Sequence, residues 1–495
     1  MKQKQYDQLV AEGYNRIPIM REVLADTETP LSVYLKLAKG RNSYFFESVQ
    51  GGEKWGRYSI IGLPCRTTLT VRDKKITIET DGNVQDEFVT DEPFAFVAEF
   101  KSRFKVAEIP DKQRFSGGLV GYFSYDTVRF VETKLGPADN KDEIDTPDIF
   151  LMLSEELVVF DNLRGTISFI INVDPREVGS FGDAQKRLDR LQDALKTPVS
   201  LPLINSGEDL SMHEFKHHFP KSAFEAAVER IKDYIVAGDA MQVVLAQRMS
   251  IDFPGDPVNV YRALRYLNPS PYMVFFDMGD HQVVSASPEI LARVEAGKIT
   301  VRPLAGTRKR GSSEKEDLAL EEDLLGDQKE IAEHLMLIDL SRNDSGRVSK
   351  IGSVSVTKKM FVERYSHVMH IASIVESEIR EDKDSLDVLK ATLPVGTLSG
   401  APKIRAMQII DELEPEKRGI FGGAMGYLGW NDNMDMAIAI RTAVVKSGKL
   451  YVQAGAGIVA DSEPSSEWEE TQNKAKAIVL AVELVKNSLS LDTTD

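Results

Sequence analysis

The chain has 495 residues and a formal net charge of −16, from 61 Lys and Arg against 77 Asp and Glu. Hydrophobic residues make up 42% and charged residues 28%, which excludes a largely disordered or collagen-like chain. The acidic balance excludes duplex binding unless basic residues gather in a local patch, and none is visible. An anionic substrate would therefore have to be received by a few placed cations.

The single cysteine, Cys65, can form neither an internal disulfide nor a zinc site by itself. The first residues contain no apolar h-region of a secretory signal, and no apolar run approaches the ~20 residues that span a bilayer. We therefore expect a reducing, cytoplasmic setting, with no membrane partner and no nucleic acid.

Residues 1–197 predict a strand-rich N-terminal part. Short alternating or apolar runs recur there, separated by turn residues such as those at 51–52 and 81–83. Residues 198–220 lack periodicity, are rich in Pro, Ser and Gly, and are predicted to be a linker. The expected strands of the N-terminal part are residues 58–62, 67–72, 117–125, 149–153, 157–160 and 166–171.

Residues 221–488 predict a second part, followed by a short tail at 489–495. Its first helix is expected to begin with a capping box of Ser222 and Glu225 and to stop at Gly238. Because strands and helices then mix without βαβ alternation, the sequence favours an α+β fold. The other expected helices are residues 327–340 and 466–486, and the expected strands are residues 242–246, 272–277, 282–285, 298–302, 423–429, 437–445 and 450–454.

Two of these helices carry acidic residues at helical spacing. Such a stripe is usually a solvated face, but two acidic faces can also converge on Mg²⁺, which takes a few carboxylates and keeps several waters. Spacing alone leaves both interpretations open. On the first helix the polar face is expected to contain Glu330, Glu333 and His334, opposite Ile331, Leu335 and Ile338; on the last helix it contains Glu467, Glu470 and Lys474.

Two small-residue segments and three histidines have more than one interpretation. Residues 455–460 follow a predicted strand and resemble a dinucleotide fingerprint, but no helix starts soon enough to receive a pyrophosphate. They are either a backbone cradle for a carboxylate or a tight strand ending. Residues 396–403 are an anion-binding helix start or a capped loop. His213 and His217 lack a third metal ligand, and His370 lies in an apolar segment typical of a core histidine.

Taken together, five runs in the second part resemble the chorismate-utilising enzymes. Two shorter runs in the first part, residues 46–48 and 55–59, extend the resemblance to nearly the whole chain. It implies an antiparallel-sheet-rich fold of two sheets packed as a sandwich with helices outside. It also implies the branch that converts chorismate and ammonia to anthranilate and pyruvate, the first committed step of tryptophan biosynthesis. The five runs are residues 301–308 (VRPLAGTR), 333–344 (EHLMLIDLSRND), 396–403, 455–459 and 467–474.

The resemblance assigns roles to individual residues. Mg²⁺ would be the cofactor, and a general acid would need a carboxyl kept protonated by a dry pocket. Arg441 suits a carboxylate because a guanidinium can donate two hydrogen bonds to it. Phe421 departs from the tyrosine of many relatives and can offer only packing. The implied roles are catalysis for His370, Thr397 and Glu289, substrate binding for Gly306, Thr307, Phe421, Arg441, Gly455, Ala456 and Gly457, and metal binding for Glu333 and Glu470.

The residues at two positions distinguish the anthranilate-forming branch from related chorismate-utilising enzymes. Isochorismate synthases have a water-activating lysine where this chain has Gln242. Aminodeoxychorismate synthases have a nucleophilic lysine where it has Ala305, which cannot form a covalent link. These two enzymes remain alternatives, as does a catalytically silent regulatory subunit that binds tryptophan, although the intact acids count against the latter.

The resemblance further implies regulation and a partner. L-Tryptophan would bind in a pocket shared by the two parts and inhibit with a coupling of about 1–3 kcal/mol. A separate glutaminase subunit would supply the ammonia, in a heterotetramer of two large and two small subunits. The residues expected in the tryptophan pocket are Glu47, Ser48, Pro271, Tyr272 and Met273.

Overall fold

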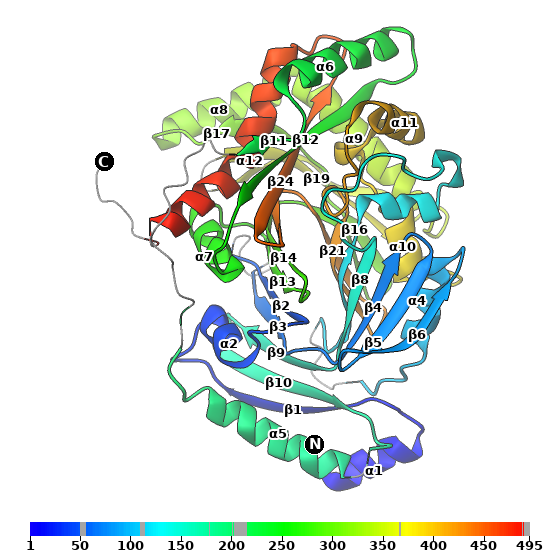
Figure 1. Cartoon of the computed structure of the whole chain (residues 1–495), viewed down its shortest axis with the longest axis vertical. Helices are drawn as coiled ribbons and strands as arrows, with labels where there is room; N and C mark the ends of the chain where they lie inside the picture. The colour runs from blue at the N-terminus through cyan, green and yellow to red at the C-terminus, as the bar shows by residue number, and fades with distance from the viewer. Residues whose placement is uncertain are drawn as a thin grey trace.

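Two large antiparallel sheets pack face to face with helices on their outer sides (Figure 1), which confirms the predicted α+β sandwich. The structure is a computed structural model that describes residues 1–49, 56–108, 114–177, 179–199, 201, 215–365, 368–487 and 489. The predicted turn at 51–52, Trp55, His213, most of the linker and most of the tail lie outside the described residues.

The first sheet joins strands of both predicted parts. Strand β2 of the N-terminal part pairs with β13, so that Glu47 lies opposite Met273. In spatial order its strands are β1 (Ile17–Leu24), β10 (Thr166–Val173), β9 (Glu156–Asp161), β3 (Tyr58–Gly62), β2 (Ser43–Glu47), β13 (Tyr272–Asp277), β14 (His281–Ser287), β23 (Thr442–Lys446), β24 (Lys449–Ile458), β12 (Gln242–Asp252) and β11 (Lys216–His217), with β20 (Gly400–Ala401) pairing with β12.

The second sheet is shared in the same way, because β7 of the N-terminal part pairs with β21. The boundary between residues 1–197 and 221–488 stays a prediction, and both sheets cross it. In spatial order the strands are β17 (Leu304–Lys309), β19 (Val368–Glu378), β16 (Lys298–Val301), β15 (Ile290–Glu295), β22 (Met434–Ile438), β21 (Ala424–Gly429), β7 (Gly118–Phe123), β8 (Ile149–Ser154), β4 (Thr67–Arg72), β5 (Lys75–Thr80) and β6 (Asn83–Val89), with β18 (Ser355–Arg364) pairing with β19.

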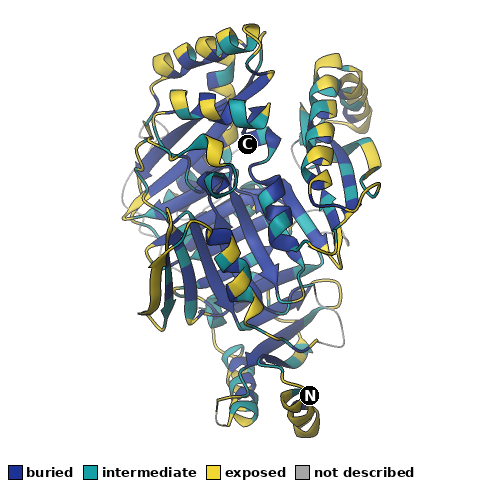
Figure 2. Cartoon of the chain, turned by 90° about the vertical axis from the view of Figure 1, so that its right-hand side faces the viewer, coloured by how far each residue is buried: buried dark blue, intermediate teal, exposed yellow. Residues whose placement is uncertain are grey.

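Apolar side chains fill the space between the sheets, and both sheets are largely buried (Figure 2). Tyr44 and Phe276 of the first sheet pack with Tyr122 and Met425 of the second. The helices are α1 (Gln3–Ala11), α2 (Pro30–Leu37), α4 (Pro93–Ser102), α5 (Ser180–Ala194), α6 (Lys221–Val236), α7 (Pro257–Leu267), α8 (Glu314–Gly326), α9 (Gln328–Gly346), α10 (Ser385–Thr392), α11 (Lys403–Leu413) and α12 (Pro464–Lys486).

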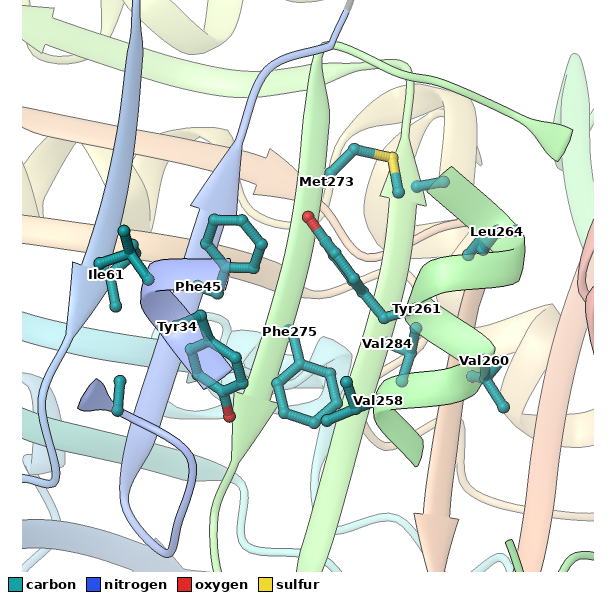
Figure 3. Close-up of a cluster of buried hydrophobic side chains, with 14 of the residues drawn as sticks. Tyr34, Phe45, Ile61, Val258, Val260, Tyr261, Leu264, Met273, Phe275 and Val284 are labelled. Atoms are coloured by element: carbon teal, nitrogen blue, oxygen red, sulfur yellow. The ribbon is translucent and has the colours of Figure 1, made fainter. Parts of the chain in front are cut away.

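A second apolar cluster covers the outer face of the first sheet and ties the two parts together (Figure 3). Tyr34 and Phe45 of the N-terminal part stack at 5.7 Å, and Tyr34 meets Phe275 edge to face at 5.6 Å. Tyr261 of α7 packs on both Phe45 and Phe275. Aromatic pairs of this kind add stability beyond the area they bury.

Among the described residues, no helix combines the length and apolar character required to cross a bilayer.

Two predictions about helices are wrong. Helix α6 starts at Lys221 with Pro220 as its N-cap, so Ser222 lies inside the first turn and the predicted capping box does not form. Helix α9 faces the core with His334 and Leu337, whereas Leu335 is exposed. Ile338 of the predicted stripe is buried, but the stripe is rotated toward His334, whose Nε2 atom lies 2.7 Å from the Ser373 hydroxyl of β19.

Two predictions about strands also differ from the structure. Residues 437–445 form parts of two strands, β22 and β23, because the chain crosses from the second sheet to the first around Arg441. Arg441 has a φ of 48°, a backbone conformation unusual for a residue with a side chain. Residues 455–458 continue β24 instead of following it, since they pair with Val243–Ala246 of β12.

Candidate active site

Glu289 lies on the connection between β14 and β15, where the chain passes from one sheet to the other. Its side chain is only 6% exposed, and its Oε1 atom has no hydrogen-bond partner among the described residues. Burial raises the pKa of Glu289 to about 8, although the charges of Arg302, Lys474 and Arg441 act in the opposite direction. At neutral pH the carboxyl therefore keeps its proton and can donate it.

Thr397 and Glu289 line the same cavity, which has an empty volume of about 380 Å³. Thr397 belongs to a 3₁₀ turn at Gly396–Leu398, and its Oγ1 atom is buried without a hydrogen-bond partner among the described residues. Buried polar atoms usually have a partner, so two such atoms on one cavity indicate a place for a polar ligand. The remaining polar side chains of this lining come from Arg302, Ser341, Asp344 and Thr392.

His370 lies on β19 and is held by β17 opposite it. Its Nδ1 atom is 2.9 Å from the carbonyl oxygen of Gly306 and 3.0 Å from the hydroxyl of Thr307. Because a carbonyl oxygen only accepts hydrogen bonds, Nδ1 carries the proton and Nε2 is left as an acceptor. Burial lowers the pKa of His370 to about 4, so the ring is neutral at pH 7.

The backbone and surroundings of Gly306 favour glycine at this place. Its φ is 68°, and a Cβ there would approach Glu330 Oε2 at 3.2 Å and Leu324 at 3.0 Å. The register of β17 against β19 shifts between Ala305 and Thr307, which is a bulge. The predicted substrate residues Gly306 and Thr307 therefore lie between His370 and the acidic helix α9.

The segment Gly455–Gly457 forms a strand with one open edge. One edge of this segment pairs with β12. On the other edge, β23 pairs with β24 only up to Val452, and no other described strand pairs with Gly455–Gly457. Lys474 of α12 donates to the carbonyl oxygen of Gly455 at 2.9 Å. Arg441 directly precedes β23, so a half-buried guanidinium and a glycine-lined strand edge occur where β23 begins. This arrangement suits a carboxylate.

The acidic residues of α9 and α12 occur at neighbouring helix starts. Lys329 at the start of α9 forms an ion pair with Asp461, which precedes α12, at 3.5 Å. Burial raises the pKa of Glu330, and the charge of Glu333 raises it further; burial and the charge of Glu470 do the same for Glu467. These carboxylates thus gather in positions where a cation would be favourable.

Carboxylate oxygens of this kind are chemically suited to Mg²⁺, and the role of Glu333 and Glu470 as its ligands stays a prediction. The described residues contain no group of three or more side chains close enough to hold a metal by themselves. Mg²⁺ needs no such cage, because it binds through one or two carboxylates and keeps waters or substrate oxygens. In the structure Glu470 forms an ion pair with Lys474 at 2.7 Å, so the negative charge of Glu470 is compensated.

Phe421 is buried away from Glu289. It lines a different cavity, of about 320 Å³, together with Arg418, Thr442 and Gln453. The centre of its ring is 5.8 Å from the Arg418 guanidinium. Phe421 therefore lines a cavity other than that of Glu289 and Thr397, and its role in substrate binding stays a prediction.

A larger pocket, with an empty volume of about 790 Å³, lies at the seam of the two parts. Glu47 in this pocket accepts hydrogen bonds from Arg265 at 2.6 and 2.8 Å and from the Tyr261 hydroxyl at 3.1 Å. Figure 3 shows Tyr261 beside Met273 on the covered face of the sheet. All five residues predicted for a regulatory pocket line it, namely Glu47, Ser48, Pro271, Tyr272 and Met273.

Two further residues of the site were not singled out from the sequence. Arg302 is 5% exposed and brings a positive charge to Glu289, and Tyr365 packs on the ring of His370 at 5.6 Å. Arg302 lies within residues 301–308, one of the five runs of the resemblance, and this is the only sequence feature that could have pointed to it. Tyr365 lies outside all of them, and only the pairing of β18 with β19 brings it to the site.

Comparison with known proteins gives consistent matches over the full length. The family described as chorismate binding enzyme matches residues 43–480. "Anthranilate synthase component 1" of Pseudomonas aeruginosa is 58% identical over 494 residues, covering 99% of this chain and 100% of that protein. The protein of the same name from Aquifex aeolicus is 50% identical over 487 residues, 97% of each chain.

Solved structures give the same picture. The crystal structure of anthranilate synthase component I from Streptococcus pneumoniae matches with a TM-score of 0.75 and 39% identity, over 92% of this chain and 98% of that one. The menaquinone-specific isochorismate synthase from Escherichia coli matches with a TM-score of 0.69 over 97% of this chain and 98% of that one. Its identity is 18%, so it supports the fold alone.

Proposed function

Because the chain belongs to the chorismate-binding enzyme family, in its anthranilate synthase component I branch, we propose that it converts chorismate and ammonia to anthranilate and pyruvate in a Mg²⁺-dependent reaction. The observation that carries the mechanism is the buried, protonated Glu289, whose unpartnered Oε1 lines the same cavity as the unpartnered Thr397 hydroxyl. A proton donor of this kind suits the loss of a hydroxyl group from the ring.

Substrate binding uses positive charge at two places. The enolpyruvyl carboxylate of chorismate would be received by Arg441 and the open edge of Gly455–Gly457. When bound by Glu333 and Glu470, Mg²⁺ would supply charge neutralisation for the ring carboxylate and a fixed orientation. Gly306 would leave room for the ring, since a side chain there would fill the space toward Glu330.

The first half of the reaction exchanges a hydroxyl for an amine. The lone pair of ammonia attacks C2 as both conjugated ring double bonds shift and the bond from C4 to its hydroxyl breaks; the ammonium group formed at C2 then loses one proton to become the amine. Glu289 gives its proton to the departing oxygen, which leaves as water. Thr397 lies on the same cavity and can hold that oxygen through its hydroxyl.

The second half removes pyruvate. The proton on C2 must leave while the bond from C3 to the enolpyruvyl oxygen breaks, and the ring becomes aromatic. His370 can accept that proton at Nε2, because its Nδ1 is committed to Gly306 and the ring is neutral. The released enolpyruvate takes up a proton and becomes pyruvate.

The ammonia would come from a separate glutaminase subunit. Cys65 is the only cysteine in the sequence, it is buried, and burial raises the pKa of its thiol. A glutaminase nucleophile needs an accessible thiolate, which Cys65 cannot provide. We therefore expect the chain alone to use ammonium salts but not glutamine. The heterotetramer of two large and two small subunits is an expectation from the family.

The identity of the product tests the proposed function against its sisters. Gln242 packs against Gly457, where an added Cβ would come within 2.4 Å of its Nε2 atom, and it offers no base to activate water. Ala305 offers no nucleophile. Purified chain with chorismate, ammonium and Mg²⁺ should yield anthranilate by chromatography. Isochorismate or aminodeoxychorismate as the end product would assign the chain to a sister activity, and unconsumed chorismate would favour a regulatory subunit.

The pH dependence of the activity follows from the shifted pKa values of Glu289 and His370. Activity with saturating ammonia should fall as the pH rises through about 8, because Glu289 then loses the proton that it must donate. On the acid side, activity should fall only near pH 4, where His370 becomes protonated. A profile of kcat against pH, corrected for the fraction of ammonia, checks both limbs. A flat profile between pH 7 and 9.5 would remove Glu289 as the acid.

We further propose that L-tryptophan binds in the pocket at the seam and inhibits the enzyme. An indole buries a large apolar area and needs a partner for its N–H, and this pocket combines apolar walls with the carboxylate of Glu47. Because β2 and β13 both line it, a ligand there can favour one arrangement of the two parts.

Ser48→Phe should abolish this inhibition while leaving catalysis intact, because a phenyl ring would fill the pocket far from Glu289. Inhibition curves for L-tryptophan on the wild type and the variant measure the effect, with Ser180→Phe at the start of α5 as a control outside the pocket. Unchanged inhibition in Ser48→Phe would remove Ser48 from the tryptophan site.

A further inference from the structure

Tyr365 lies in the short connection between β18 and β19, and a residue outside this connection holds its main chain. Its carbonyl oxygen accepts a hydrogen bond from Arg310 Nη1 at 2.6 Å. Arg310 is itself anchored by two hydrogen bonds of 2.8 and 2.9 Å to Asp317 on α8. The backbone position of Tyr365 is therefore held by the Arg310–Asp317 ion pair, which is not part of the candidate active site.

The ring of Tyr365 meets the ring of His370 edge to face. The ring centres are 5.6 Å apart and the planes are inclined by 66°. His370 has a second constraint, the hydrogen bond from Nδ1 to Gly306. Together these contacts define both the position of the His370 ring and the direction of Nε2, since aromatic pairs favour this geometry.

The hydroxyl of Tyr365 closes a triangle with the buried Arg302 and the partly buried Glu363. It accepts a hydrogen bond from Arg302 Nη2 at 2.8 Å and donates one to Glu363 Oε2 at 2.9 Å. Arg302 also pairs directly with Glu363 at 2.8 Å. Burial raises the pKa of Tyr365 to about 12, so the hydroxyl keeps its proton and the direction of these bonds is fixed.

Arg302 is the link from this triangle to the acid. It directly follows β16, lines the cavity of Glu289 and Thr397, and brings a positive charge to Glu289. The other charged groups that face Glu289 are Lys474 and Arg441, and Asp344 lines the same cavity. One side chain, Tyr365, thus contacts the proposed base with its ring and the cation beside the proposed acid with its hydroxyl.

We propose that Tyr365 is a positioning residue for the reaction, which fixes the ring of His370 through its own ring and fixes Arg302 beside Glu289 through its hydroxyl. The proposal rests on the proposed function, because it gives His370 and Glu289 their roles. Tyr365 contacts His370 with its ring and Arg302, which lines the cavity of Glu289, with its hydroxyl, so one side chain touches neighbours of both proposed catalytic groups.

Two variants separate the contributions of the ring and the hydroxyl. Tyr365→Phe keeps the contact with His370 and loses both hydrogen bonds of the hydroxyl, so kcat should fall about fivefold with KM for chorismate unchanged. The limb of the pH profile on the basic side should also move to higher pH, because a less fixed Arg302 stabilises the ionised Glu289 less. Tyr365→Leu loses the ring contact as well, and kcat should fall by about a further fivefold.

Tyr266→Phe is the matched control, since Tyr266 is 61% exposed on α7, and it should behave as the wild type. Wild-type kcat and pH profile in Tyr365→Phe would overturn the proposal, whatever the fate of Tyr365→Leu. A change in KM alone would overturn it too, because Tyr365 would then contact the substrate. A wild-type chain that forms no anthranilate would overturn the proposed function first, and this proposal with it.

Discussion

Replacing Glu289 by Gln is expected to lower kcat for anthranilate formation about 10²–10⁴-fold, with little change in KM for chorismate. Gln has the same size and can accept hydrogen bonds, but it has no acidic proton to give to the departing hydroxyl. The buried site that raises the pKa of Glu289 favours a neutral side chain, so the variant should fold as well as the wild type. Fluorescence of the anthranilate formed measures the rate.

The control for this prediction is Glu295→Gln. Glu295 ends β15, the strand that Glu289 directly precedes, but Glu295 is exposed and pairs with Arg114 at the surface at 3.3 Å. Loss of activity in the control alone, or wild-type kcat in Glu289→Gln, would contradict the assignment of the acid. A loss that shows only in KM would instead point to a role in binding.

Replacing Glu470 by Gln is expected to lower kcat/KM by about 100-fold or more at physiological Mg²⁺, because a side chain that would bind the metal directly loses its charge. Raising the Mg²⁺ concentration should restore part of the activity, which a general loss of structure would not allow. The same result is expected for Glu333→Gln on α9, since the two helices would share the ion. Titrations of activity with Mg²⁺ give the metal requirement of each variant.

Glu469→Gln is the matched control, because Glu469 is the exposed neighbour on the same helix. Glu470 also pairs with Lys474, which donates to Gly455, so a change in chorismate KM without a change in metal requirement would indicate that this pair matters instead. A Glu470→Gln variant with wild-type rates and wild-type metal requirement would falsify the metal assignment.

Local patterns predicted the strands that pack on both sides or alternate clearly. The expected residues 58–62, 67–72 and 272–277 coincide with β3, β4 and β13. Other strands were not predicted, among them β5 (Lys75–Thr80), although its residues alternate. Strand β17 contains Gly306, Thr307 and Arg308, which suit a turn as well as a strand, and it is a strand because β19 pairs with it.

The roles of the site residues could be predicted only through the resemblance, which also covers Glu289, His370 and Arg441 outside the five runs. The acids of α9 and α12 were visible as helical stripes, but spacing could not decide between a solvated face and a metal site. The position of Tyr365, the burial of His334 and the open edge beside Gly455 depend on strand pairings between segments far apart in sequence. No local pattern carries that information.

The most direct test of the account is anthranilate formation by the purified chain, followed by fluorescence in chorismate, ammonium and Mg²⁺ and repeated with EDTA. We predict a steady increase in anthranilate that EDTA abolishes and that added Mg²⁺ restores. Anthranilate formed at the same rate in EDTA would contradict the Mg²⁺-dependent mechanism. Chorismate consumed without anthranilate would contradict the proposed reaction.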